Sequence, residues 1–132
     1  MRDKPCLTSA DAAKIVTACK AEAQKNKWNV SIAVLDEGGI LLEFHRMEGA
    51  PPISAEVSIG KARTAAMTRR PSKFFEDRVK ERPAFANFPA GILIQGGLPI
   101  MHKNECVGAI GVSGVQSHED EQVAQAGVNV LG

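Results

Sequence analysis

Residues 28–45 read WNVSIAVLDEGGILLEFH, and this stretch decides the fold class. Apolar side chains alternate with their neighbours over Trp28–Leu35 and again over Ile40–His45, which predicts two strands. The Asp-Glu-Gly-Gly sequence at 36–39 is a turn, because its glycines can adopt positive φ angles. A hairpin of this kind predicts an antiparallel sheet rather than the parallel sheet of βαβ proteins.

Outward from the hairpin, the chain alternates between helical and extended patterns. We expect helices over about 9–25, 55–69 and 73–81 and from Ser117 onward, with Thr8, Ser54, Ser72 and Ser117 as capping residues. Residues 82–89 are expected to form a loop, and further strands are expected at 91–95, 98–102 and 106–113. The prediction is an α/β (α+β) fold, with a five-stranded antiparallel sheet flanked by helices in the order α-β-β-α-(α)-β-β-β-α.

Length and charge limit the possible functions. The chain has 132 residues, which favours a single domain over 1–132. Lys and Arg number 16 against 15 for Asp and Glu, and this balance argues against a nucleic-acid-binding protein. No apolar run is long enough to span a membrane, and residues 1–5 do not resemble a secretion signal, so we expect a cytoplasmic protein.

The cysteines and histidines supply the candidate metal ligands. Cys19 and Cys106 belong to no C-x-x-C pair, and we expect them to be small buried apolar residues. His45 and His102 lie on predicted strands, where an imidazole could bind a metal, ligate a haem iron or transfer a proton. The alternative for either histidine is a structural or surface role.

A paired glycine and a basic helix supply the candidate ligand-binding residues. Gly96 and Gly97 precede Leu98 and Pro99, and this bend could expose backbone N–H groups to a planar or anionic ligand. A plain hairpin turn is the alternative.

Cations cluster in the middle of the chain, at Arg46, Lys61 and Arg63. Lys61 and Thr64 share one helical face, which could bind carboxylates or could be a solvated surface.

Several segments together resemble the GlcG/HbpS family. They are FHRMEGA at 44–50, KARTA at 61–65, GGLPI at 96–100, VGAIGVSG at 107–114 and the segment 120–127. Glu48 stands where the family usually has Asp. The resemblance implies a five-stranded sheet between helices and assembly into homo-oligomers. The family includes haem-binding proteins, some of which degrade haem or sense redox stress, and the C-terminal domain of PduO corrinoid adenosyltransferases.

The first hypothesis is a haem-binding protein, with haem or a related tetrapyrrole in a cleft near the Gly96-Gly97-Leu98-Pro99 turn. His102 or His45 would ligate the iron. The carboxylates would be bound by Arg46, Lys61 and Arg63.

The second hypothesis is a catabolic isomerase, tautomerase or lyase that acts on a small carboxylated compound. Glu48 or His45 would be the base and Arg46 or Lys61 the carboxylate clamp, with the glycine N–H groups as oxyanion donors. The third hypothesis is a non-catalytic oligomeric accessory module. The first two hypotheses require the glycine bend and the basic helix to line one cavity.

Overall fold

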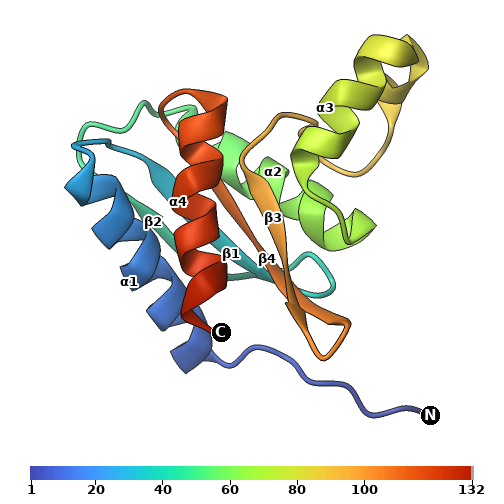
Figure 1. Cartoon of the computed structure of the whole chain (residues 1–132), viewed down its shortest axis with the longest axis horizontal. Helices are drawn as coiled ribbons and strands as arrows, with labels where there is room; N and C mark the ends of the chain where they lie inside the picture. Colours follow the sequence, from blue (N-terminus) through green and yellow to red (C-terminus); the bar gives the residue numbers. More distant parts are fainter. Residues whose placement is uncertain (132) are drawn as a thin grey trace.

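Four antiparallel strands form the central sheet of residues 1–131, the part of the chain that this computed structural model describes. Their spatial order is β2-β1-β4-β3 (Figure 1). The strands are β1 (Ser31–Asp36), β2 (Leu41–Arg46), β3 (Gly97–His102) and β4 (Glu105–Ser113). The helices are α1 (Ser9–Lys25), α2 (Ser54–Thr68), α3 (Ser72–Glu81) and α4 (Ser117–Val130), with a short 3-10 helix η1 (Pro83–Asn87). The mixed α+β class and the antiparallel sheet are confirmed, whereas a fifth strand is absent from these residues. No helix within residues 1–131 is long and apolar enough to cross a membrane.

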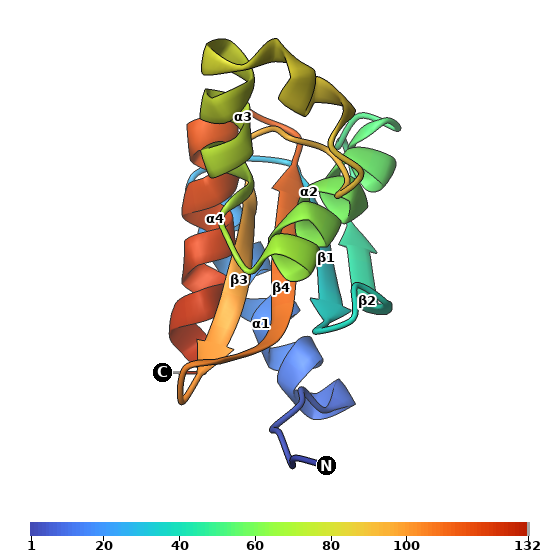
Figure 2. The same cartoon turned by 90° about the vertical axis from the view of Figure 1, so that its right-hand side faces the viewer.

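The sheet lies between two helical layers (Figures 1 and 2). Ile32 and Val112, from β1 and β4, belong to a large apolar core that they share with α1 and α4. On the opposite face, Ala33 and Leu35 pack against Ala62 of α2. The alternation along β1 therefore distributes its side chains between two cores, which explains why every residue of the strand except Asp36 is buried.

Glycines let α2 approach the sheet closely. A Cβ on Gly111 of β4 would overlap the carbonyl of Ser58, and a Cβ on Gly97 of β3 would overlap the carbonyl of Lys61. Both glycines therefore mark the close approach of another backbone, which belongs to α2.

The expected strand at 91–95 is wrong. Its backbone groups bind α2 instead of a neighbouring strand: the N–H of Ile92 donates to the carbonyl of Gly60 at 3.0 Å, and the carbonyl of Ile92 accepts from the Thr64 hydroxyl at 2.9 Å. A short apolar run looks the same in sequence whether its hydrogen bonds go to a strand or to a helix.

The helix caps are only partly as expected. Thr8 caps α1, as predicted, and the structure adds that it does so in a reciprocal pair with Asp11. The predictions for the three serines are wrong. Ser54, Ser72 and Ser117 are the first residues of their helices and not the capping residues before them. Ser54 and Ser72 are buried and bind across elements: the Ser54 hydroxyl lies 2.8 Å from that of Ser31, and Ser72 binds the backbone of β3.

Candidate functional site

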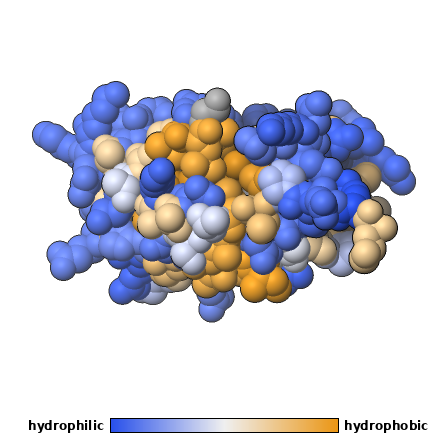
Figure 3. Space-filling model, turned by 90° about the horizontal axis from the view of Figure 1, so that it is seen from below, coloured by the Kyte–Doolittle hydropathy of each residue, from blue (hydrophilic) through white to orange (hydrophobic). Residues whose placement is uncertain are grey.

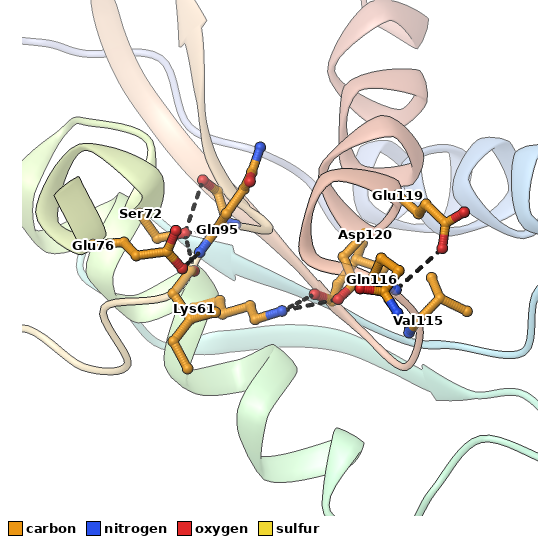
Figure 4. A network of polar contacts seen from close by, with 11 residues as sticks. Lys61, Ser72, Glu76, Gln95, Val115, Gln116, Glu119 and Asp120 are labelled. Carbon is orange, nitrogen blue, oxygen red and sulfur yellow. Dashed lines mark hydrogen bonds and ion pairs between the residues drawn. The ribbon is translucent and has the colours of Figure 1, made fainter.

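Lys61, predicted to bind ligand carboxylates, is buried in an internal ion pair (Figure 4). Its Nζ lies 3.0 Å from Oδ2 of Asp120 and donates to the carbonyl of Val112 at 3.0 Å. The two side chains are only 2% and 3% exposed. Both acceptors come from the chain itself, so in this structure Lys61 has internal partners where both ligand-binding hypotheses expect a ligand carboxylate.

Asp120 has a second internal partner. Its Oδ1 accepts a hydrogen bond from the backbone N–H of Val115 at 3.1 Å. Burial raises the pKa of Asp120, while the charge of Lys61 and the Val115 hydrogen bond oppose that rise. The pair joins α2 on one face of the sheet to the first turn of α4 on the other, so it links the two helical layers.

The glycine bend lies next to α2, as both ligand-binding hypotheses require, but the two are in direct contact rather than on either side of a cavity. The N–H of Gly97 donates to the Ser72 hydroxyl at 2.8 Å, and the carbonyl of Gly96 accepts from the N–H of Val112 at 3.0 Å. A Cβ on Gly96 would lie 2.8 Å from Nζ of Lys61. The predicted convergence is thus present, but the expected cavity between the bend and the helix is filled. The N–H of Gly97 is not available as an oxyanion donor.

Thr64 is also committed within the protein. It is fully buried, and its hydroxyl binds the carbonyls of Gly60 and Ile92. Its position on the Lys61 face of α2 therefore reflects packing rather than ligand binding. Pro99 lies on β3, at the outer edge of the sheet, and is partly exposed.

The exposed cations do not converge. Arg63 lies beside the β1–β2 turn, because a Cβ on Gly39 of that turn would lie 3.9 Å from Cγ of Arg63. Arg46 is the last residue of β2 and lies at the opposite end of the same hairpin. Glu48 is exposed in the loop between β2 and α2. Arg46 and Glu48 thus remain near each other along the chain, while Arg63 belongs to a different part of the surface.

His45 and His102 lie at opposite edges of the sheet. His45 on β2 pairs with Ile32 of β1, which in turn pairs with Val112 of β4. His102 on β3 pairs with Glu105 of β4. Three strand spacings amount to about 14 Å, and seven residues along β4 amount to about 23 Å. One chain therefore cannot place both imidazoles on the same iron.

His102 borders two hollows at the end of the molecule that holds the start of α1 and the end of α4. The first hollow has a volume of about 220 Å³ and the second about 400 Å³, and they share His102 and Leu131. Figure 3 shows this end from below, with apolar surface across its middle. The first hollow is lined by Pro5, Cys6, Leu7, Asp11, Ile100, His102, Val107 and Leu131. The second is lined by Met101, His102, Lys103, Val128, Asn129 and Leu131.

Sequence reasoning missed the partner of Lys61, although a signal existed. Lys61 lies three residues after Ser58 and four before Ala65, which places it on the buried stripe of α2. Asp120 likewise lies three and seven residues before Val123 and Gly127, on the buried stripe of α4. Two opposite charges on two buried stripes indicate an ion pair. No comparable sequence signal indicated that Pro5, Cys6 and Leu7 of the N-terminal segment would line the first hollow.

Comparison with known proteins identifies sequence relatives over most of the chain. Residues 7–129 match the family model described as "Haem degrading protein HbpS-like". Protein GlcG from Escherichia coli is 45% identical over 114 residues, which cover 86% of this chain and 85% of GlcG.

Solved structures agree with this family match. A double mutant of HbpS from Streptomyces reticuli superposes with a TM-score of 0.93 at 34% identity, covering 100% of this chain and 91% of HbpS. A structure described as a PduOC:heme complex has a TM-score of 0.88 at 22% identity, covering 95% and 94% of the two chains. The second likeness shows the fold alone.

Proposed function

This chain belongs to the HbpS-like family of haem-degrading proteins, and from that premise we propose that it binds haem or a related tetrapyrrole. The family match over residues 7–129 is the observation that carries the proposal. The whole-length similarity to HbpS supports it, as does the fold shared with a protein described in complex with heme.

The hollows beside His102 fit this group better than the glycine bend does. Haem needs an apolar surface for its macrocycle and a neutral imidazole nitrogen for its iron. His102 is exposed, and Leu7, Ile100 and Val107 give the first hollow apolar walls.

A volume of about 220 Å³ is smaller than the usual range of ligand pockets, roughly 300–1,000 Å³. The group would therefore extend over the second hollow, where Lys103 supplies a cation for a carboxylate. We thus move the expected cleft from the start of β3, at Gly97, to its end, at His102. Bound haem would supply an iron for redox or oxygen chemistry, and the protein would supply its ligand and its apolar enclosure.

The enzymatic alternative has lost support, because Lys61 is paired with Asp120 and the N–H of Gly97 is bound by Ser72. His45, Arg46 and Glu48 remain exposed or half-exposed, and Arg46 is left as the candidate carboxylate clamp. Homo-oligomeric assembly and a cytoplasmic location remain parts of the proposal.

A hemin titration followed by visible absorbance tests the proposal. We expect the Soret band of hemin to shift on binding, and His102→Ala to remove that shift or to change the final spectrum. His45→Ala is the matched control, since His45 lies at the opposite edge of the sheet, and it should bind as the unchanged protein does. An identical spectrum for His102→Ala would assign the iron to another ligand, and the absence of any shift would overturn haem binding.

A further inference from the structure

The two edges of the sheet differ in their protection. Edge strands expose unpaired backbone groups, and proteins that stay monomeric usually protect such strands with proline, lysine or a covering element. β3 carries Pro99, whereas β2 carries neither proline nor lysine and is the outermost strand in Figure 2. Leu41 and Leu42 of β2 are 46% and 38% exposed. The β2 edge is thus suited to pairing with another strand.

The hydrogen-bonding pattern identifies which groups point away from the sheet. The N–H of Met47 donates to the carbonyl of Val30 at 3.0 Å, so this opposed pair is hydrogen-bonded. Since bonded and non-bonded pairs alternate along an antiparallel ladder, Phe44 and Arg46 direct their N–H and C=O groups outward.

The side chains of β2 favour a second copy of the same strand. In a two-fold antiparallel pair centred on Phe44, Phe44 meets its own copy, and Glu43 of each chain lies opposite His45 of the other. Shifting the pair by two residues in one direction opposes Glu43 to Glu43, which is repulsive. Shifting it the other way opposes His45 to His45. Pairing of the Glu43 carboxylate with a His45 donor therefore favours the register centred on Phe44. In that register Phe44 also forms a hydrogen-bonded pair with Phe44 of the second copy.

One carboxylate oxygen of Glu43 has no hydrogen-bond partner among residues 1–131. Its Oε2 is buried and accepts no hydrogen bond among the described residues. Buried carboxylate oxygens are normally paired. A histidine from a second copy, opposite Glu43 on the same face of the joined sheet, would supply a donor beside this carboxylate.

We propose that β2 pairs with β2 of a second copy of this chain, with Phe44 on the two-fold axis and reciprocal Glu43–His45 contacts between the copies. The two four-stranded sheets then form one continuous sheet. This inference rests on the homo-oligomer of the proposed function but not on haem binding, because His102 lies on the opposite edge strand.

Sedimentation of charge-exchange variants tests the interface. Glu43→Lys places a lysine opposite His45, and His45→Glu opposes two glutamates, so each single variant should weaken dimerisation roughly tenfold or more. The double variant places an introduced lysine opposite an introduced glutamate in this register and should recover the dimer. Circular dichroism checks that each variant is folded. An unchanged protein that stays monomeric, or single variants that dimerise as well as it does, would overturn the proposal.

A cross-linking experiment keeps the test independent of variant stability. On a Cys6→Ser background, Phe44→Cys should form a disulfide between copies, because the Cα atoms of a bonded antiparallel pair lie about 5.5 Å apart. Arg46→Cys is the matched control, since Arg46 meets Leu42 rather than itself in this register. Cross-linking of Arg46→Cys in preference to Phe44→Cys would contradict the register. Hemin titration of the same samples distinguishes failure of the interface from failure of haem binding.

Discussion

At the scale of single residues, Asp120 balances an ammonium group that is shielded from water. Asp120→Asn would leave the buried charge of Lys61 without its counter-charge. Breaking a buried ion pair by removing one partner typically costs about 3–5 kcal/mol. We expect a loss of this size in the free energy of unfolding, measured by urea denaturation.

The double variant Lys61→Met with Asp120→Leu is the control for this prediction. It removes both charges and replaces them with apolar side chains, so it should recover much of the lost stability. If Asp120→Asn lost less than about 1 kcal/mol, water or another group would have to solvate Lys61.

The capping residue Asp11 gives a prediction about pH. The backbone N–H of Thr8 donates to its carboxylate at 2.9 Å, and this bond, followed by the contact with the Thr8 side chain, holds the pKa of Asp11 below its ordinary value of 3.8. A lowered pKa means that the contribution to stability is present above 3.8 and is lost as the pH falls through the folded-state pKa. The difference in unfolding free energy between the unchanged protein and Asp11→Asn should therefore shrink on acidification from pH 7 to below that value. A difference that grew on acidification would contradict the assignment.

Residues whose role is set by their neighbours in sequence could be predicted. The pairing of Thr8 with Asp11 is local, and burial of Cys19 follows from the helical period; burial also raises the pKa of the Cys19 thiol to about 12. The same period places Lys61 and Asp120 on buried stripes, but their contact is not local, because it joins positions 59 residues apart.

At the scale of elements, the contact of α2 with the sheet depends on glycine. Gly97→Ala would insert a Cβ into the backbone carbonyl of Lys61, and such overpacking typically costs about 1–3 kcal/mol. Gly38→Ala is the matched control, because a Cβ there would meet only Oδ1 of Asp36, at 3.4 Å. Thermal unfolding should show a clearly lower melting temperature for Gly97→Ala than for Gly38→Ala. Equal melting temperatures would mean that α2 can move away from β3 at little cost.

The prediction of whole elements succeeded where the pattern had one structural solution. The hairpin at 28–45 combines two alternating runs with a glycine turn, and it formed β1 and β2 as expected. The run at 91–95 had two solutions, and the helix supplied the hydrogen bonds that a strand would have supplied. The choice depended on the position of α2, which no local pattern encodes.

At the scale of the whole molecule, the motifs predicted the layers of the fold but not where open space remains. The glycine bend and α2 share a face of the sheet as expected, and close packing then removed the cavity expected between them. The space beside His102 depends instead on three distant segments: the N-terminal tail, the β3–β4 hairpin and the end of α4.

The N-terminal tail should therefore contribute more to ligand binding than to stability. Pro5 and Cys6 line the first hollow beside His102. The tail is otherwise tied by two partly exposed ion pairs, Arg2 with Glu105 at 2.8 Å and Lys4 with Glu37 at 4.0 Å. An exposed ion pair contributes about 0–1 kcal/mol, so removal of residues 1–6, which deletes two such pairs, should change the unfolding free energy by no more than about 2 kcal/mol. The same removal opens one wall of the hollow, and the dissociation constant for hemin should rise several-fold. Arg2→Ala, which loses the ion pair but keeps the wall, should retain the affinity of the unchanged protein. If the truncated chain bound hemin as tightly as the full chain, the macrocycle would have to lie outside this hollow, even if His102 still ligated the iron.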